Sequence, residues 1–479
     1  MHRKSTFTKD LFMVAFSNFI ILISSIITGF VVPKILGVVG YGYYKIFTLY
    51  LSYSALMHLG YVDGVLLTFA GKEYNELSQE KFRMYTKFFF FFQCVVSVLI
   101  VFIAMVLLKD RYKLIFLFLG IDIFAINMTA YYQYISQSTM RFDELSIRKV
   151  MFATFEIMLV LAIVWFNFVN KRKFIDVNIY VGGLVFIDVV LMIWYVFTYR
   201  KLSIGECDSF SNCKDDIKSF FKEGIILTIA YQAASIVFSL DSQFVSVFYD
   251  ATTFAVYSFA YSLISMVTTV ISAVAFVLLP RLRKINDKEK IMNTFSNAMA
   301  LISITATLSM AGYQPLCILI SSFFSEYIDS IRYLRVIIPG LALSCCINII
   351  MFTYYKAINK HMIYFKISLV SLTIAILCNY LAYKFYHDAI YISFASIITL
   401  IIWYIMNVIY FVIKYQINWK KNFIYIILSM TVYYILTWYI KNELLSWILF
   451  IFYFIISTGV MHAGIMREIL MKFIKGKYL

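Results

Sequence analysis

The chain has 479 residues, of which 62% are hydrophobic and 14% are charged, and its formal net charge is +16. A soluble protein of this length carries about 25% charged residues, so the composition excludes an ordinary soluble domain. Repeated apolar runs of about 18 residues or more predict transmembrane helices, and their continuous character excludes a transmembrane β-barrel, whose strands alternate.

Fourteen membrane spans are predicted in chain order. The first follows a basic start (Arg3, Lys4 and Lys9) and is too long for the core of a signal peptide. An even number of spans places both termini on one side. The connections on that side hold roughly 30 Lys and Arg, against roughly 11 on the other side, so the termini are expected in the cytoplasm. The spans lie near residues 11–33, 43–70, 85–108, 114–136, 149–169, 178–199, 222–241, 252–279, 294–323, 333–355, 363–384, 389–413, 423–440 and 444–466.

Two outer connections depart from this distribution of charge. Residues 109–113 include Lys109, Arg111 and Lys113, and residues 171–173 are Lys-Arg-Lys. They weaken the charge bias of the first half without reversing the predicted orientation.

The second half of the chain repeats the spacing of the first. A shift of about 213 residues places ILGVVGYGYYKIF, which begins at Ile35, on FYDATTFAVYSFA, which begins at Phe248. Spans 1–6 then map onto spans 7–12, and parallel repeats of this kind occur in transporters that rock one half against the other. We therefore predict an N-lobe over 1–205, a cytoplasmic linker over 206–221, a C-lobe over 222–415, and two further helices with a cytoplasmic tail over 416–479.

Missing motifs argue against an enzyme. The sequence has no Gly-x-x-x-x-Gly-Lys-Ser/Thr stretch, so it carries no ATPase motif of that type, and no extramembrane segment is large enough for a catalytic domain. The first outer connection, residues 34–42, lacks the carboxylates that many membrane glycosyltransferases keep there. No metal site is predicted, because the loop with Cys207 and Cys213 has no His and lacks the spacing of zinc sites.

Several motifs resemble those of bacterial polysaccharide flippases. PKILGVVGYGYY (Pro33–Tyr44) and LGYVDG (Leu59–Gly64) are similar to the first two spans of that family. FAVYSFAYSL (Phe254–Leu263) resembles its eighth span, and LRVIIPG (Leu334–Gly340) resembles the start of its tenth. The resemblance implies the multidrug/oligosaccharidyl-lipid/polysaccharide exporter superfamily. The implied fold is all-α and membrane-spanning, with two six-helix lobes in a V around a central cavity and two C-terminal helices beside them.

By this resemblance, the protein would move undecaprenyl-diphosphate-linked oligosaccharide from the inner to the outer leaflet of the bacterial cytoplasmic membrane, for O-antigen or capsule assembly. Its implied partners are the lipid-linked substrate, membrane lipids, a polysaccharide polymerase and glycosyltransferases, and no nucleic acid. No organic cofactor is expected, although H⁺ or Na⁺ is a candidate coupling ion. An ion-coupled multidrug exporter and a peptidoglycan-precursor flippase of the same superfamily are the alternatives.

Four basic residues are candidates to bind the diphosphate. Arg335 and Arg332 lie at the outer end of span 10, Lys45 at the outer end of span 2, and Lys366 near the inner end of span 11. A guanidinium can direct two donors onto phosphate oxygens. The alternative is that these side chains reach the lipid headgroups and only anchor their helices.

Three acids lie deeper in the predicted membrane region. Asp188 is near the middle of span 6, Asp122 is about 12 Å into span 4, and Glu156 is about 10 Å into span 5. A charge at this depth usually faces a cavity or a partner. We expect the three to include a proton or cation coupling site; structural, hydrogen-bonded acids are the alternative.

A last group of residues suggests gating or helix packing. Asp63 is flanked by Gly60 and Gly64, which permit bending or close approach of helices. Pro339 is expected to kink span 10.

Overall fold

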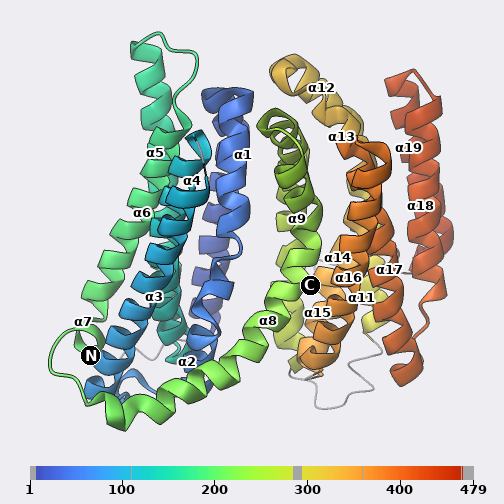
Figure 1. Ribbon diagram of the computed structural model, residues 1–479. Coiled ribbons are helices and arrows are strands. Elements are labelled where there is room, and N and C mark those ends of the chain that lie inside the picture. The colour runs from blue at the N-terminus through green and yellow to red at the C-terminus, as the bar shows by residue number, and fades with distance from the viewer. Residues whose placement is uncertain (1–6, 109, 284–293, 359, 465–466, 468–479) are drawn as a thin grey trace. The chain divides into compact units, whose positions relative to one another are not determined.

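A computed structural model of the protein describes residues 7–108, 110–283, 294–358, 360–464 and 467. Every regular element within these ranges is a helix (Figure 1). The chain divides into two compact units, Met1–Ser235 and Ile236–Leu479, and the division falls inside the long helix α8 (Phe210–Phe248). Residues from Phe210 to Phe221, which the sequence suggests are part of a linker, form the first turns of that helix.

Thirteen helices of the described residues are long and apolar enough to cross a membrane. The first of them, Phe16–His58, is 43 residues long and contains a break at Gly37, so its two arms account for the difference from the fourteen predicted spans. Unit 1 holds α1 (Phe7–Leu51), η1 (Ser54–His58), α2 (Tyr61–Phe69), η2 (Tyr74–Glu76), α3 (Gln79–Leu107), α4 (Asp110–Ser138), α5 (Phe142–Val169), α6 (Val177–Thr198), α7 (Arg200–Ser203) and the first part of α8.

The break in α1 lies at Gly37, whose φ of 65° and ψ of 173° are not helical. Span 1 is predicted to end at Pro33, but α1 continues through this proline. Ile175 N donates to Ile35 O (2.9 Å), so the break lies beside the connection between α5 and α6. A proline removes one donor from a helix, whereas a positive φ is a conformation that glycine adopts without steric cost.

The two arms of α1 run in opposite directions. The first runs alongside α5, where Ser24 Oγ donates to Glu156 Oε2 (2.7 Å). The second continues through η1 and α2 to Gly71, whose N–H donates to Ser138 O (2.9 Å) at the end of α4. The chain therefore crosses unit 1 twice between Phe7 and Gly71, as spans 1 and 2 predict.

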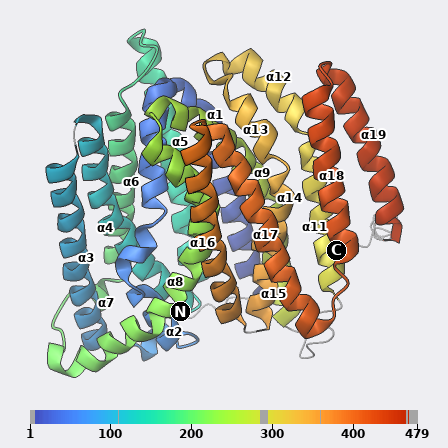
Figure 2. The ribbon, with the colours of Figure 1, turned by 45° about the vertical axis from the view of Figure 1, so that its right-hand side comes forward.

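Unit 2 holds the rest of α8 and the elements that follow it. The helix that corresponds to span 10 is divided, and Pro339 lies between two of its pieces. The elements are α9 (Ala251–Arg283), α11 (Phe295–Met310), α12 (Tyr313–Phe323), η3 (Ser325–Tyr327), α13 (Ser330–Ile337), α14 (Gly340–Cys345), η4 (Cys346–Met351), α15 (Phe352–Ala357), α16 (His361–Tyr386), α17 (Ala389–Tyr415), α18 (Lys420–Tyr439) and α19 (Glu443–Met461). Figure 2 shows α18 and α19 side by side, and both contact α11.

The turn between α8 and α9 has its counterpart in the first unit. Asp250 lies 213 residues after Gly37, and each of these residues separates two long helical segments. Thr253 N donates to Asp250 Oδ1 (3.2 Å), and the Thr253 hydroxyl donates to the same oxygen. The bond from the hydroxyl is the main reason that the pKa of Asp250 lies below its ordinary value. The spacing of the sequence repeat thus matches these two turns.

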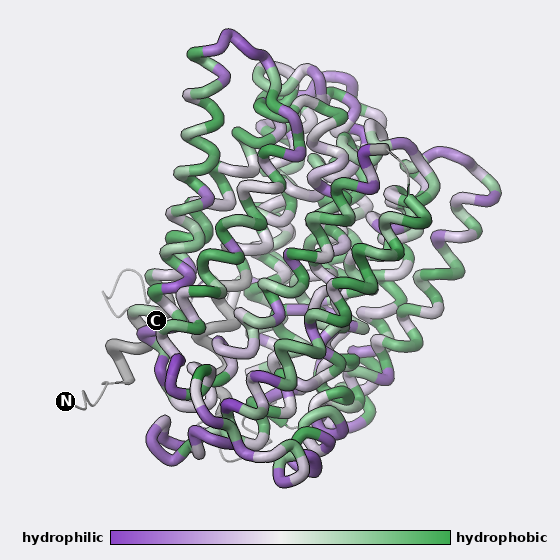
Figure 3. Tube along the Cα trace, turned by 60° about the vertical axis from the view of Figure 1, so that its left-hand side comes forward, coloured by the Kyte–Doolittle hydropathy of each residue, from purple (hydrophilic) through white to green (hydrophobic). Residues whose placement is uncertain are grey.

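The outer faces of the helices are apolar. Large side chains such as Phe102, Phe186, Ile413 and Phe452 are more than half exposed. Hydrophobic residues follow the lengths of the helices, and hydrophilic residues gather at their ends and connections (Figure 3). This pattern fits helices surrounded by lipid, and the chain is a multi-pass membrane protein.

Candidate functional site

The three predicted acids come together within unit 1. Asp122 on α4 is fully buried, and its carboxyl lies beside that of Asp188 on α6, which in turn interacts electrostatically with Glu156 on α5. Neither oxygen of Asp122 has a hydrogen-bond partner of ordinary geometry among the described residues. Ser24 donates to Glu156 from the first arm of α1. We refer to Asp122, Asp188 and Glu156 as the acid cluster.

Tyrosine side chains and one lysine lie next to the acid cluster. Tyr44 and Tyr180 pack edge to face with ring centroids 5.1 Å apart, and both interact electrostatically with Glu156. The Lys45 ammonium lies 5.3 Å from the ring centroid of Tyr41 and 5.6 Å from that of Tyr44. No ion pair to Lys45 forms within the described part of the chain. The second arm of α1 therefore holds a partly buried cation against Tyr44, which itself interacts with Glu156 of the acid cluster.

The acid cluster is not a recognisable metal site. The described residues include no group of three His, Cys, Asp or Glu side chains with the arrangement of metal ligands. The acid cluster consists of carboxyl groups close to one another within membrane-spanning helices. When ionised, such groups need a proton or a cation to offset their charge.

The second span is interrupted beside α3 and α4. The interruption consists of η1 and two residues in the left-handed region, Leu59 (φ 48°) and Gly60 (φ 85°). Gln93 Nε2 donates to Met57 O (3.2 Å), and Asn127 Nδ2 donates to Ser54 O (3.2 Å). These buried amides thus satisfy carbonyls that a continuous helix would have used, a condition for irregular backbone inside a membrane.

Sequence reasoning missed Gln93 and Asn127, although a signal was present. Each is an uncharged polar residue inside an apolar run, and Asn127 Nδ2 also donates to Gln93 Oε1 (2.9 Å). The sequence gives no indication that their partners are the backbone carbonyls of an interrupted helix.

Gly60 and Gly64 belong to a close crossing of α2 and α8. A Cβ added at Gly64 would lie 2.1 Å from Phe220 O, and one added at Gly224 would lie 1.8 Å from Gly60 O. Asp63, on α2, accepts a hydrogen bond from the Thr228 hydroxyl on α8. The structure places these glycines and Asp63 at a packing contact, and it adds Gly224, which sequence reasoning missed, to the group. We refer to this contact as the glycine crossing.

The two predicted arginines have partners within unit 2. Arg332 pairs with Asp388, the residue that caps α17. Arg335 Nε donates to Tyr313 Oη (2.9 Å), and its guanidinium carbon lies 5.9 Å from the ring centroid of Trp438 on α18. Lys366 is exposed on the face of α16 that also carries Met362, Leu369 and Val370. The structure does not bring these three cations together with Lys45 in one unit.

A further buried acid lies in unit 2. Asp241 on α8 is 3% exposed and accepts hydrogen bonds from Tyr257 Oη (2.9 Å), from the Tyr261 hydroxyl and from Ser242 N (2.6 Å). No buried acid is predicted in the second half of the sequence. Asp241 is the last residue of the seventh predicted span, and the polar Ser242 and Gln243 follow it, so its burial was not evident from the sequence.

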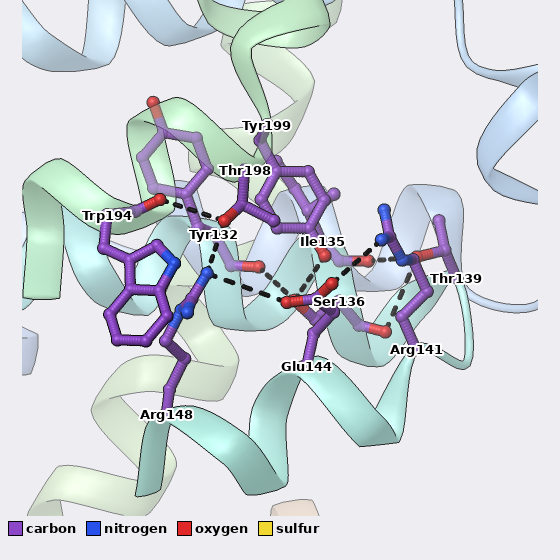
Figure 4. A network of polar contacts seen from close by, with 10 residues as sticks. All are labelled: Tyr132, Ile135, Ser136, Thr139, Arg141, Glu144, Arg148, Trp194, Thr198 and Tyr199. Atoms are coloured by element: carbon purple, nitrogen blue, oxygen red, sulfur yellow. Dashed lines mark hydrogen bonds and ion pairs between the residues drawn. The ribbon is translucent and has the colours of Figure 1, made fainter. Parts of the chain in front are cut away.

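Figure 4 shows a polar network that joins the ends of α4, α5 and α6. Glu144 accepts from Arg141 (3.2 Å) and pairs with the buried Arg148 (3.7 Å). The Arg148 guanidinium lies over Trp194, 4.0 Å from its ring centroid, and donates to the Thr198 hydroxyl. Both arginines thus contact one carboxylate and an aromatic face, Arg141 that of Tyr74 and Arg148 that of Trp194, so each buried or half-buried cation has a partner. Sequence reasoning did not identify this network.

Three solved structures of transporters share the fold. The lipid II flippase MurJ in an inward closed conformation has a TM-score of 0.70 at 15% identity and covers 95% of this chain and 99% of its own. An inward-facing MATE family multidrug resistance transporter of the MOP superfamily has a TM-score of 0.62 at 10% identity, covering 84% and 94%. A mutant of the Vibrio cholerae MATE transporter VcmN has a TM-score of 0.56 at 11% identity, covering 84% and 96%.

No relative was found among curated proteins. The model of the polysaccharide biosynthesis protein family matches residues 7–286, which is more than half of the chain. The fold is shared with these solved transporter and flippase structures. The chain belongs to the polysaccharide biosynthesis protein family.

Proposed function

We propose that the protein is a flippase that moves an undecaprenyl-diphosphate-linked oligosaccharide from the inner to the outer leaflet of the bacterial cytoplasmic membrane, with both termini in the cytoplasm. The observation that carries the proposal is the family match over residues 7–286 on a multi-pass helical fold shared with transporters. The product would serve surface polysaccharide assembly, with a polymerase and glycosyltransferases as partners.

The task requires a polar path. An oligosaccharide with roughly a dozen hydroxyls, each costing about 4 kcal/mol to bury unpaired, would meet a barrier of up to roughly 50 kcal/mol in hydrocarbon. At a barrier of this height, thermally activated crossing is too slow to be useful. A polar path through the protein would lower the barrier while the lipid tail stays in the bilayer, and alternating access would open that path to each leaflet in turn.

The experiment that tests this function uses cells that lack the protein. We would extract their undecaprenyl-linked intermediates and determine which leaflet holds them. Complete repeat units trapped on the cytoplasmic side, together with loss of surface glycan, are the expected result. Trapped peptidoglycan precursor would favour the alternative lipid flippase. Unchanged intermediates with increased drug accumulation would favour a multidrug exporter.

We infer that Lys45 binds the diphosphate of the substrate. Its ammonium is partly buried against tyrosine rings without an ion-pair partner among the described residues, so an anionic ligand would offset a charge that the protein leaves uncompensated. Arg335, Arg332 and Lys366 are further proposed contacts. Arg332 would have to exchange Asp388 for phosphate.

Replacing Lys45 by Ala is expected to lower the transport rate by about tenfold to a hundredfold, because a charge-assisted hydrogen bond is lost. Lys45→Arg should retain part of the activity. The measurement is the rate of oligosaccharide appearance on the cell surface at matched protein levels. Lys87→Ala, at an exposed position of α3, is the control. Equal transport by Lys45→Ala and the control would contradict the assignment.

Arg335→Ala is expected to abolish transport, whereas Arg335→Lys keeps a part, if this guanidinium contacts the diphosphate. Because Arg335 also donates to Tyr313, a loss of packing has to be separated from a loss of binding. Tyr313→Phe removes that hydrogen bond and leaves the charge. Thermal stability in detergent and transport should therefore be measured for all three variants. Full transport by Arg335→Ala at normal expression would contradict the assignment of Arg335 to the diphosphate.

We also propose that the acid cluster couples transport to a proton or cation gradient. Three carboxyl groups close together at membrane depth can be accommodated if protons or a cation offset their charge, and exchange of that ion would then be linked to the conformation of unit 1. Either H⁺ or Na⁺ meets this requirement.

A further inference from the structure

Six basic side chains gather at one end of unit 1. They come from three parts of the chain: the break in α1, the start of α4 and the connection between α5 and α6. We define the basic end of unit 1 as Lys34, Arg111, Lys113, Lys171, Arg172 and Lys173.

Contacts join the three parts at this end. Ile175 N donates to Ile35 O (2.9 Å), which places the α5–α6 connection against the break that holds Lys34. Tyr43, six residues beyond Gly37, packs edge to face against Tyr112 with ring centroids 5.1 Å apart, and the Arg111 guanidinium carbon lies 5.9 Å from the Tyr43 ring centroid. The start of α4 therefore lies at the same end.

Few acids oppose these charges. Asp176 caps α6 by accepting from Asn178 N (2.8 Å), and the side chain of Asp110 lies outside the described residues. Arg111, Lys171 and Arg172 are exposed, and neither they nor Lys113 form an ion pair with another described residue. This end of unit 1 thus carries an excess of positive charge.

The same end carries exposed aromatic side chains. Trp165 and Phe168 on the last turns of α5 are 68% and 77% exposed. Arg172 and Lys173 lie over the rings of Phe166 and Phe174, with centroid distances of 5.6 Å and 4.8 Å. Figure 3 shows hydrophilic connections at the ends of hydrophobic helices. Aromatic rings beside cations are typical of the membrane–water interface, so this end fits the depth of lipid headgroups.

We propose that the basic end of unit 1 binds the headgroups of anionic phospholipids in the outer leaflet. The proposal rests on the orientation proposed above and does not depend on the transported substrate. Basic residues are ordinarily concentrated on the cytoplasmic side, so these side chains lie where the charge rule disfavours them. Anionic headgroups offset such charges, and the exposed aromatic rings reach the acyl region below them. A soluble acidic polymer would leave those rings without a role.

The test uses the full chain in nanodiscs of phosphatidylcholine with a minor fraction of phosphatidylglycerol, and native mass spectrometry counts the lipids that remain bound. Wild type should retain phosphatidylglycerol selectively. The variant K171Q/R172Q/K173Q should bind it more than about tenfold more weakly, since each basic residue contributes to the attraction. The charge-conserving variant K171R/R172K/K173R should bind as wild type. The variant K414Q/K420Q/K421Q, changed at exposed positions of unit 2, should keep the selectivity.

Three outcomes would overturn the proposal. Equal retention of the two lipids by wild type is one. The second is that K171Q/R172Q/K173Q retains as much phosphatidylglycerol as wild type. If this variant also lost binding to the soluble acidic polysaccharide alginate, the basic end would bind such a polymer rather than lipid. The third concerns orientation: Arg172→Cys should react with a membrane-impermeant maleimide in intact cells. Labelling only after permeabilisation would place this end in the cytoplasm, whatever the transported substrate.

Discussion

Gly224→Ala is expected to destabilise unit 1 severely. The new Cβ would lie 1.8 Å from Gly60 O and 2.5 Å from Gly64 N, both of which are backbone atoms that cannot move aside as a side-chain end would. To make room, α2 and α8 would have to separate, and the Asp63–Thr228 hydrogen bond would be stretched. We expect a cost of at least roughly 2–3 kcal/mol. The measurements are the yield of monodisperse protein in detergent and its thermal unfolding temperature.

Gly459→Ala is the matched control. Gly459 lies in α19, and a Cβ there would meet nothing within 4 Å. The same chemical change should therefore be neutral or stabilise by about 0.5–1 kcal/mol through helix propensity. Gly64→Ala, whose Cβ would lie 2.1 Å from Phe220 O, should behave like Gly224→Ala. If Gly224→Ala and Gly459→Ala unfold at the same temperature, α2 and α8 do not approach each other as closely at the glycine crossing as the structure shows.

The membrane-spanning segments were predictable from the sequence because each one depends on the residue composition of that segment alone. Continuous apolar runs predict fourteen spans, and the structure has thirteen candidate helices among the described residues, the first containing the break at Gly37. Gly37 lies within the predicted connection between spans 1 and 2, residues 34–42. A glycine at this position permits the positive φ at which the chain reverses. Local chemistry therefore decided both the number of crossings and the place of the first reversal.

Contacts between helices were not predictable in the same way. Gln93 and Asn127 bind carbonyls of η1 that lie 36 and 73 residues away in the chain. The partner of Gly60 is Gly224, at the start of the seventh predicted span (222–241) and 164 residues away in the chain, and nothing in the sequence of either glycine points to the other. A single sequence shows which residues are unusual for a membrane span but not which of them meet. The acid cluster was named as a group because depth alone made its members unusual.

Neutralising the acid cluster should uncouple transport from the ion gradient. In the double variant Asp188→Asn/Glu156→Gln, the amides keep the size and part of the hydrogen bonding of the carboxyl groups, including acceptance from Ser24, but they do not take up a proton and have no negative charge to offset that of a cation. We expect transport to fall at least about tenfold in energised vesicles, which is the loss of roughly 1.4 kcal/mol of coupling. The measurement compares transport with and without an imposed proton or sodium gradient.

Asp122→Asn separates coupling from structure. Asp122 is fully buried beside Asp188, without a hydrogen-bond partner of ordinary geometry among the described residues, so the amide keeps the shape of the side chain and removes a group that can exchange a proton. If the acids are only structural, this variant should unfold at an altered temperature and still respond to the gradient. If they hold the coupling ion, it should fold as well as wild type or better and lose the response.

Asp143→Asn provides the control for the loss of a charge as such. It lies on α5, the same helix as Glu156, but it is exposed in the first turn. Its transport should equal that of wild type under both gradients. The coupling proposal fails if Asp188→Asn and Glu156→Gln each leave the transport rate and its dependence on the gradient unchanged. Asp241 would then be the next acid to test, because it is buried in unit 2 and lies outside the acid cluster.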